Sequence, residues 1–255
     1  MLTKPLIPKT FVETKAVQMV RKAIEYAMIS AYPACIVSEP GRGKTTALFY
    51  LATEFDGAYI EIGAQQKSIG GMYRGIALAI GASLGGYDRE TLDSVLRQFE
   101  RRARYSGANK DLLVVDEFQT LEDTTKRELL RIHETAGFAL VISGNEGRLG
   151  SDRRGTAREL EQVQSRIGLT MPLPNLDAED CDLIAKAYGV SGDDALKAVR
   201  NLGTKTSARE LGRTLQLAQH MTGGAAPIQL PHIRNAVFSL KGKQSALKVL
   251  DSRED

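Results

Sequence analysis

Two glycines, a lysine and a threonine stand close together in the segment Ser38–Thr45, which reads SEPGRGKT. The apolar run Ala34–Val37 precedes this segment as a buried strand would, and Thr46–Leu51 continues beyond it as a helix. This order of strand, loop and helix is the setting that a phosphate-binding loop requires. Gly41 and Gly43 allow backbone N–H groups to point at phosphate oxygens, and the helix N-terminus adds its positive dipole end. The segment therefore predicts a site for ATP or GTP.

The same loop offers groups for a metal ion as well as for phosphates. Lys44 would reach the β- and γ-phosphates, and the Thr45 hydroxyl would bind Mg²⁺. Ser38 departs from the pattern G-x-x-x-x-G-K-[ST], because it stands where the first glycine is expected. A chance glycine-rich turn is the alternative, which the flanking strand and helix disfavour. We expect the nucleotide to contact Ser38, Glu39, Pro40, Gly41, Arg42, Gly43, Lys44, Thr45 and Thr46.

Two adjacent acids end a second apolar run, Leu112–Val115. Asp116 would hold Mg²⁺ through its water shell, and Glu117 would orient and polarise an attacking water. Taken alone, the two acids could mark a simple transition from strand to turn. Because they follow a phosphate loop in the same chain, they favour catalysed hydrolysis of the nucleotide.

Three further polar residues are candidates for contacts with the γ-phosphate. Asn145 follows the run Phe138–Ile142, where its side chain would lie between the acids and the phosphate, although Gly144-Asn145 could also be a turn pair. Arg166 lies just before the last expected strand, where it is better placed for the nucleotide of a neighbouring subunit. Arg209 opens a helix in the C-terminal part. Either arginine could instead pair with a nearby acid, and the competing candidates for the first role are Arg153, Arg154 and Arg158.

Strand-like and helix-like patterns alternate through most of the chain. We expect strands at Ala34–Val37, Ala58–Ile62, Leu112–Val115, Phe138–Ile142 and Gly168–Met171. Helical patterns cover Lys15–Ile29, Lys44–Glu54, Gly71–Ala82, Leu92–Arg104, Thr124–Thr135 and Ala157–Ser165. This alternation predicts right-handed crossovers and a parallel sheet covered on both faces.

Beyond Pro172-Leu173-Pro174 the pattern is helical throughout. Residues typical of helix starts recur there, namely Asp177, Gly192, Ser207 and Pro231. We therefore expect an α/β domain over residues 1–172 and a small all-helical domain over residues 173–255.

Composition excludes several other classes of protein. Hydrophobic residues make up 42% of the chain and charged residues 25%, which is typical of an ordinary soluble protein. The formal net charge of +3 is too small to indicate a nucleic-acid partner without clustering. Cys35 and Cys181 lie in apolar contexts and favour a reducing compartment over a disulfide. There is no apolar signal region and no run of membrane-spanning length, so we expect no membrane partner and a cytoplasmic location.

Taken in order, the phosphate loop, Asp116-Glu117, Asn145, Arg166 and Arg209 resemble the AAA+ ATPases. A closer set of segments is similar to the phage Mu transposition protein B (MuB) family, and more distantly to the TnsC regulators of Tn7-like transposons. These segments are Phe11–Thr14, Ser38–Thr45, Val114–Glu117, Gly144-Asn145, Ser165–Ile167 and the Arg209 helix with Leu215–Ala218. The resemblance implies an AAA+ fold with a five-stranded parallel sheet between helices, followed by a helical lid.

The resemblance also implies an ATP-dependent protein that forms filaments on duplex DNA without sequence preference, inside the bacterial host. Such a protein selects target DNA, recruits or activates a transposase, and leaves when ATP is hydrolysed. In this sequence the DNA-facing loops correspond to Gly63–Ser68 and Gly85–Arg89, so we expect Lys67, Arg74 and Arg89 to contact phosphates. Two alternatives stay open: a helicase-loader or replication-initiator ATPase, and a nucleotide-gated protein-interaction module that binds no nucleic acid.

Overall fold

A computed structural model describes residues 11–105, 111–145, 163–224, 226–242 and 244–251. The chain divides into two compact units. The first unit contains Met19–Pro40 and Lys44–Leu173. The second contains the segment ending at Gln18, the tip of the phosphate loop at Gly41–Gly43, and the chain from Pro174 onward.

The first unit is built on a five-stranded parallel sheet. Its strands are β1 (Ala34–Val37), β2 (Ala58–Glu61), β3 (Leu112–Asp116), β4 (Ala139–Gly144) and β5 (Leu169–Pro172), in the spatial order β2-β3-β4-β1-β5. Every neighbouring pair is parallel, so the expected sheet is confirmed. Two strands run further than the sequence indicated, because β3 includes Asp116 and β4 continues to Gly144. Polar residues expected just after these strands therefore belong to them.

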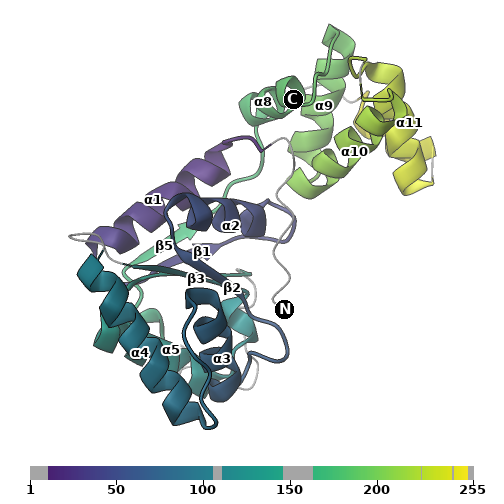
Figure 1. Ribbon diagram of the computed structural model, residues 1–255. Helices are drawn as coiled ribbons and strands as arrows, with labels where there is room; N and C mark the ends of the chain where they lie inside the picture. Colours follow the sequence, from purple (N-terminus) through teal and green to yellow (C-terminus); the bar gives the residue numbers. More distant parts are fainter. Residues whose placement is uncertain (1–10, 106–110, 146–162, 225, 243, 252–255) are drawn as a thin grey trace. The chain divides into compact units, whose positions relative to one another are not determined.

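Helices cover both faces of the sheet. They are α1 (Lys15–Ile29), α2 (Lys44–Glu54), α3 (Ile69–Ile80), α4 (Asp88–Tyr105) and α5 (Asp123–Ala136), with a short 3₁₀ helix η1 (Phe118–Thr120) after β3. Figure 1 shows α1 and α2 on one face and α3, α4 and α5 on the other. Helix α4 begins at Asp88 rather than at Leu92, because the Glu90 carboxylate accepts the N–H of Gly86 at 2.8 Å and caps an earlier turn. The expected helix Ala157–Ser165 lies mostly outside the described residues.

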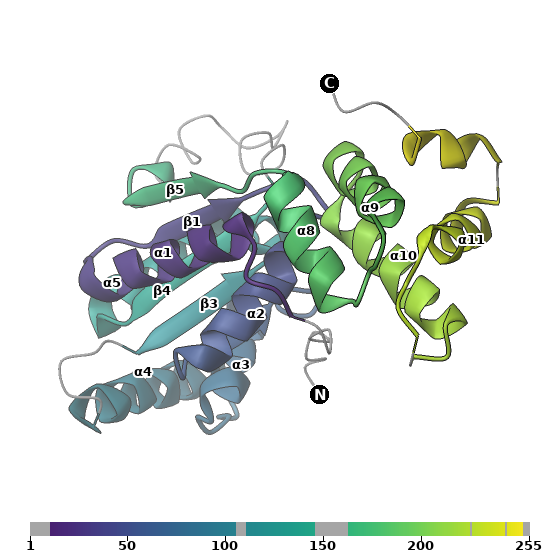
Figure 2. The ribbon, with the colours of Figure 1, turned by 90° about the horizontal axis from the view of Figure 1, so that it is seen from above.

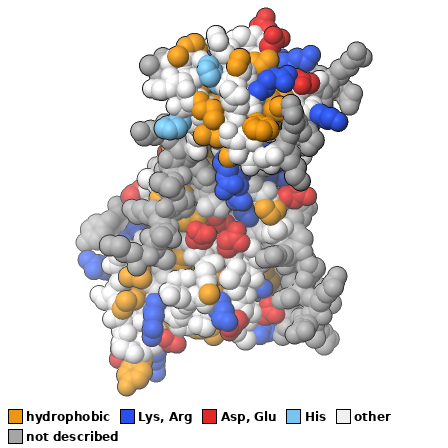
Figure 3. Space-filling model, turned by 90° about the vertical axis from the view of Figure 1, so that its right-hand side faces the viewer, with side chains coloured by type: hydrophobic (Ala, Val, Ile, Leu, Met, Phe, Trp, Pro, Cys, Tyr) orange, Lys and Arg blue, Asp and Glu red, His pale blue; other side chains and the backbone are white. Residues whose placement is uncertain are grey.

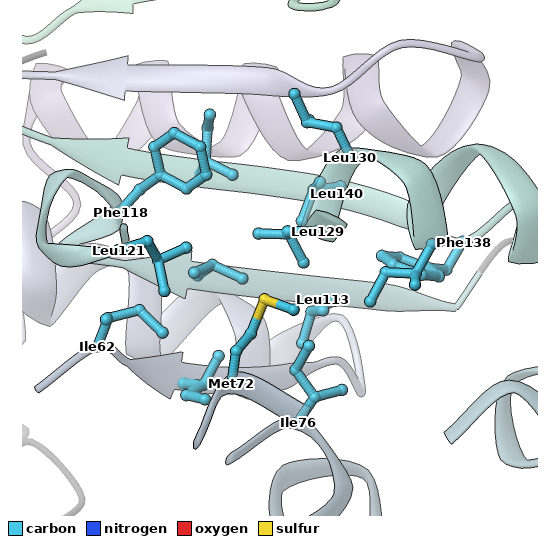
Figure 4. Close-up of a cluster of buried hydrophobic side chains, with 14 of the residues drawn as sticks. Ile62, Met72, Ile76, Leu113, Phe118, Leu121, Leu129, Leu130, Phe138 and Leu140 are labelled. Carbon is cyan, nitrogen blue, oxygen red and sulfur yellow. The ribbon is translucent and has the colours of Figure 1, made fainter. Parts of the chain in front are cut away.

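The main core lies between the sheet and the three helices α3, α4 and α5. Met72 of α3 and Leu129 of α5 are completely buried there, against Leu113 of β3 and Leu140 of β4 (Figure 4). Burying an aliphatic side chain of this size stabilises a fold by roughly 1.5–3 kcal/mol. This core anchors the strands from one side of the sheet.

The pleat of the strands directs a different set of side chains to the opposite face. Successive residues of a strand point to opposite sides of a sheet. Val115 of β3 joins the main core, so Asp116 points to the face covered by α1 and α2. By the same alternation Tyr59 and Glu61 of β2 and Ser143 of β4 point to that face. Polar side chains of three strands thus face the side from which α2 begins.

The second unit is helical. It contains α8 (Ala178–Ala187), α9 (Asp193–Lys205), α10 (Ala208–Met221), α11 (Leu230–Lys241) and the 3₁₀ helix η2 (Gln244–Val249) (Figure 2). The predicted helix starts are confirmed: Asp177 and Ser207 cap α8 and α10 with their side chains, Gly192 precedes α9, and Pro231 lies in the first turn of α11. No helix in the described part of the chain has the length and hydropathy needed to cross a membrane.

The cysteines are free and buried, one in each unit. Burial raises the pKa of both thiols, Cys35 and Cys181, to about 12. Thiols with such values stay protonated and act as small apolar groups. Cys181 also packs against Gly203 of α9, where an added Cβ would lie 2.3 Å from the Cys181 Sγ. Helices α8 and α9 therefore approach closely at this point.

Candidate functional site

The phosphate loop has the backbone conformation that its glycines permit. Gly41 and Gly43 have φ angles of +90° and +82°, which residues with a Cβ adopt only with strain. Ser38 does not have a positive φ, because Asp56 and Glu117 are the only described non-glycine residues that do. The Ser38 N–H donates to the Gly144 carbonyl at 3.3 Å and so continues the ladder between β1 and β4. A serine therefore replaces the first glycine without backbone strain.

Asp116 is the centre of a hydrogen-bond network. Its side chain is completely buried, and the Thr45 hydroxyl donates to Oδ2 at 2.7 Å. The Tyr59 hydroxyl also donates to Oδ2, at 3.1 Å, while the Ser143 hydroxyl and the Glu117 N–H donate to Oδ1. Four donors satisfy a carboxylate that would otherwise be costly to bury. The network fixes the orientation of Asp116 beside the first turn of α2.

Strand order explains why these residues meet. In the sheet β4 lies between β3 and β1, so Ser143 stands between Asp116 and the phosphate loop. Tyr59 lies on β2, on the other side of β3, and its ring packs edge-on against Phe49 of α2 with centroids 5.3 Å apart. The expected pairing of Thr45 with Asp116 is therefore accompanied by two residues that the sequence did not single out.

Thr45 and Asp116 also suit a magnesium ion. Mg²⁺ prefers oxygen ligands, dehydrates reluctantly, and is commonly held by one or two carboxylates together with substrate phosphates. The two side chains offer a hydroxyl and a carboxylate oxygen 2.7 Å apart. Among the described residues no group of three or more His, Cys, Asp or Glu side chains could hold a metal ion by themselves. The donor set therefore fits an ion that arrives with a nucleotide.

The charges beside Asp116 influence one another. Burial raises the pKa of the Tyr59 phenol, and the Asp116 charge raises it further, so Tyr59 keeps the proton that it donates. Burial also raises the pKa of the Glu61 carboxyl, with smaller contributions from Asp116 and Glu117. Glu117 is half-buried, has a left-handed φ of +56°, and its carboxylate accepts a hydrogen bond from the Gln119 amide. Glu117 is thus engaged by a neighbour in this conformation.

The other predicted nucleotide contacts lie around the loop. Lys44 is 9% exposed at the start of α2, and Thr46 is partly exposed in the first turn of that helix. Arg42 is partly exposed, whereas Glu39 and Pro40 are exposed. These positions leave the loop accessible to a ligand from the solvent side.

The three candidates for γ-phosphate contacts occupy separate places. Asn145 is half-buried directly after β4. Arg166 forms an ion pair with Glu134 of α5, with 3.5 Å between Nη1 and Oε1 and with both side chains about half exposed. Arg209 is exposed in the first turn of α10, and its N–H donates to the Gly41 carbonyl at 3.0 Å within the second unit. The competing candidates Arg153, Arg154 and Arg158 lie outside the described residues.

The three predicted DNA contacts lie on or beside the α3 region. Lys67 is exposed in the loop between β2 and α3, and its carbonyl accepts the N–H of Glu122 at 3.1 Å. Arg74 is exposed on α3, 3.9 Å from the Asp88 carboxylate, and Arg89 is exposed in the first turn of α4. An open hollow of about 450 Å³ is lined by Ser68, Ile69, Gly70, Gly71, Arg74, Asp88, Glu122 and Thr124. On the face in Figure 3, lysines and arginines lie in separate groups with acids between them, rather than in one basic patch.

Sequence reasoning missed Tyr59, Ser143 and Gln119. A signal for Ser143 was present, because it directly precedes Gly144-Asn145 at the end of an apolar run. Strand alternation places Tyr59 on the same face of β2 as Glu61, but only the strand order puts that face beside Asp116. Gln119 had no such signal, because a turn residue becomes a partner of Glu117 only through the local backbone conformation.

Comparisons with known proteins agree with this geometry. Residues 29–150 match the AAA domain family, and residues 165–240 match the C-terminal family of the Mu B transposition protein. The Mu-like prophage FluMu DNA transposition protein B of Haemophilus influenzae is 26% identical over 196 residues, which cover 75% of this chain and 66% of that protein. The ATP-dependent target DNA activator B of Escherichia phage Mu is 27% identical over 215 residues, covering 83% and 67%. The chain thus spans about two thirds of these relatives.

Solved structures show the same fold. The ORC2 protein of Aeropyrum pernix superposes with a TM-score of 0.64 at 18% identity, covering 99% of this chain and 74% of that one. The RuvB Holliday junction branch migration motor of Thermotoga maritima gives a TM-score of 0.57 at 16% identity, covering 97% and 76%. At these identities the likeness concerns the fold alone. Together with the AAA domain match, it confirms the predicted AAA+ fold class.

Proposed function

We propose that this chain, a MuB-like AAA+ ATPase, binds duplex DNA without sequence preference while it holds ATP, and marks that DNA as a transposition target. Hydrolysis then releases the DNA. The observation that supports nucleotide binding and hydrolysis is the buried Asp116 at the end of β3, which accepts hydrogen bonds from Thr45 of α2 and Ser143 of β4. The proposed DNA binding is supported by the match to the C-terminal family of the Mu B transposition protein and by the name of the phage Mu relative.

Hydrolysis would use groups from one phosphate-binding site. Lys44 neutralises the β- and γ-phosphates, and the backbone N–H groups of the loop bind their oxygens. Thr45 and Asp116 would hold Mg²⁺, which would supply positive charge beside the phosphates. Tyr59 and Ser143 keep Asp116 oriented through their hydrogen bonds. Glu117 orients the attacking water once its carboxylate is free, and Asn145 contacts the γ-phosphate.

A second copy of the chain would complete the site. Arg166 from the neighbouring protomer stabilises the charge that develops on the transferred phosphoryl group. Its ion pair with Glu134 is half exposed, and such pairs contribute at most about 1 kcal/mol, so Arg166 is readily released. In our proposal Arg209 of the lid contacts the γ-phosphate of its own protomer. Residues 1–172 form the nucleotide-binding domain and residues 173–255 the lid.

Binding to DNA would depend on Lys67, Arg74 and Arg89. Sequence-independent binding needs cations that neutralise phosphates, and these side chains are exposed. The partners we propose are duplex DNA, further copies of the chain in a filament, and a transposase, all in the cytoplasm of a bacterial host. Because ATP orders the interface between protomers, filament assembly and DNA affinity are linked to the nucleotide.

The change Glu117→Gln tests this function. The amide cannot polarise water, so we expect hydrolysis to fall at least about 100-fold, the scale of a lost general base, while ATP binding is kept. The variant should therefore accumulate on duplex DNA with ATP, as measured by co-sedimentation and electron microscopy of filaments. The unchanged chain should form filaments with ATP and not with ADP.

Glu100→Gln is the matched control, because Glu100 is exposed on α4 and is none of the predicted site residues. It should hydrolyse ATP normally. Normal hydrolysis by Glu117→Gln would remove Glu117 from its role, and equal DNA binding with ATP and ADP would contradict the proposed switch. A preference for single-stranded DNA would instead favour a helicase loader.

A further inference from the structure

The tip of the phosphate loop lies against the start of helix α10. The Arg209 N–H donates to the Gly41 carbonyl at 3.0 Å. A Cβ added to Gly41 would lie 3.2 Å from both the Cβ and the Oγ of Ser207, so the two backbones approach closely. These contacts lie within the second unit, which contains both Gly41–Gly43 and α10. A backbone group of the helical unit therefore holds one carbonyl of the phosphate loop.

The first turn of α10 has a backbone donor available for this contact. Ser207 caps the helix, because its backbone is extended and its side chain accepts the N–H of Glu210 at 3.2 Å. The first N–H groups of a helix have no acceptor within the helix. The Arg209 N–H is one of them, and the Gly41 carbonyl supplies its acceptor. The positive dipole end of the helix also favours a carbonyl oxygen at this place.

This hydrogen bond sets the direction of the peptide group that joins Gly41 to Arg42. A trans peptide is planar, and its C=O and N–H point in opposite directions. The described part of the chain contains no cis peptide bond. Because the Gly41 carbonyl points at α10, the Arg42 N–H points away from that helix. Backbone N–H groups of such loops are the groups that bind phosphate oxygens, so the direction of this N–H matters for the ligand.

We propose that the Arg209 N–H is a positioning group that holds the phosphate loop with the Arg42 N–H turned toward the phosphates of a bound nucleotide. This proposal rests on the nucleotide binding in the proposed function and adds a backbone group to it. The role is separate from that of the Arg209 guanidinium, whose proposed contact is the γ-phosphate. Loop N–H groups bind the α- and β-phosphates, which ATP and ADP share. The hydrogen bond therefore strengthens the binding of both nucleotides, whereas the guanidinium strengthens that of ATP alone.

Two substitutions of Arg209 separate the backbone group from the side chain. Arg209→Ala removes the guanidinium and keeps the N–H, whereas Arg209→Pro removes both, and the first turn of a helix tolerates proline. We expect Arg209→Pro to weaken ADP binding about fivefold, the factor that one ordinary hydrogen bond corresponds to. Arg209→Ala should leave the Kd for ADP unchanged, and both variants should bind ATP more weakly. Isothermal titration calorimetry with each nucleotide measures these constants, and an equal Kd for ADP in the two variants would overturn the proposal.

Ala208→Pro is the matched control for the proline. Ala208 is the first residue of α10, where proline is favoured, and Ser207 before it is extended with a ψ of 158°, as a residue before proline should be. Within the described part of the chain the Ala208 N–H makes no hydrogen bond, so this variant keeps the bond from Arg209. It should bind ADP as the unchanged chain does. A fivefold loss in Ala208→Pro as well would contradict the role of the Arg209 N–H.

A second test changes the loop side of the contact and needs no proline. Gly41→Ala and Gly43→Ala both place alanine at a positive φ, but only the Cβ at position 41 meets Ser207. We expect Gly41→Ala to weaken ADP binding about fivefold more than Gly43→Ala does, because the new Cβ displaces the loop from α10. Adding Ser207→Gly removes the atoms that this Cβ meets, and glycine still caps a helix well, so ADP affinity should return to that of Gly43→Ala. Equal losses at the two glycines, or a loss that Ser207→Gly does not reverse, would argue against the contact.

Failure of the proposed function gives a different result. If the unchanged chain binds ATP and ADP but no duplex DNA, the proposed function is wrong, and a weaker affinity of Arg209→Pro for ADP still supports the positioning group. If the chain binds DNA with ATP while Arg209→Pro and Arg209→Ala have the same Kd for ADP, the positioning group alone is wrong. An unchanged chain that binds neither nucleotide would overturn both.

Discussion

Gly43 and Ser38 of the phosphate loop differ in the backbone conformation that their positions require. Gly43 needs a positive φ, and an added Cβ would meet nothing within 4 Å, so only backbone strain opposes a larger residue there. Ser38 needs no such freedom, and its N–H serves the strand ladder. The departure from the usual loop pattern at Ser38 is therefore neutral for the backbone.

Substitutions at Gly43 and Ser38 should distinguish the effect of backbone strain on ATP binding from the effect of departing from the usual loop sequence. Gly43→Ala forces alanine into the left-handed region at a cost of about 1–2 kcal/mol, which weakens ATP binding about tenfold. Ser38→Gly restores the usual pattern and should change the Kd for ATP less than about twofold. Titration with a fluorescent ATP analogue measures both values. A large gain in affinity from Ser38→Gly would show that serine disturbs the loop.

Elements bring together residues that are distant in the chain. Because β4 is inserted between β3 and β1, a serine from β4 and a threonine from α2 reach the same carboxylate of β3. Alternation along β2 adds Tyr59 from the far side of β3. The site thus depends on strand order rather than on any one segment.

Close packing of α8 against α9 leaves no room for a Cβ at Gly203. Gly203→Ala would place a Cβ 2.3 Å from the Cys181 Sγ and force α8 and α9 apart. We expect the free energy of unfolding to fall by about 1–3 kcal/mol, as in other overpacked cores. Gly212→Ala in α10 is the control, because its Cβ would meet nothing and its φ is not positive, so it should stabilise by about 0.5–1 kcal/mol. Urea unfolding followed by circular dichroism measures both, and a stable Gly203→Ala would contradict the close contact.

Two proposals concern the whole molecule, one with DNA and one with a second copy. If Lys67 contacts a phosphate, Lys67→Ala should weaken binding to all duplexes alike. It should also lower the slope of log K against log salt by about 1, because one fewer counterion is released. Filter binding at several salt concentrations measures the slope. Lys22→Ala, at an exposed position of α1, is the control that should keep it, and an unchanged slope for Lys67→Ala would remove this contact.

The arginine supplied by a neighbour can be tested by mixing variants. Arg166→Ala and Glu117→Gln should each be nearly inactive, with losses of at least about 100-fold for the arginine. Mixed in one oligomer, they should regain hydrolysis, because one protomer supplies Glu117 and the other Arg166. Glu134→Gln removes only the ion-pair partner of Arg166 and should remain active. Inactivity of the mixture would place Arg166 outside the site.

Local patterns sufficed for much of the fold. The bounds of α1, α2 and β1 match the predictions from sequence, because strand and helix periodicity and the loop glycines act over a few residues. Helix ends differ from the sequence-based prediction where a side chain bonds across a turn. The start of α4, for example, depends on the Glu90 cap. Such caps need a conformation that the sequence alone does not specify.

The sequence by itself determined that the chain carries a phosphate loop, an acidic strand end and a parallel sheet, because each depends on residues adjacent in the chain. Only the tertiary structure decided which side chains meet Asp116, since β2, β3, β4 and β1 lie side by side in an order that differs from their order in the chain. It also decided that Gln119 faces Glu117, through one left-handed φ angle. Contacts that join separate elements arise from packing, and packing is a property of the whole fold.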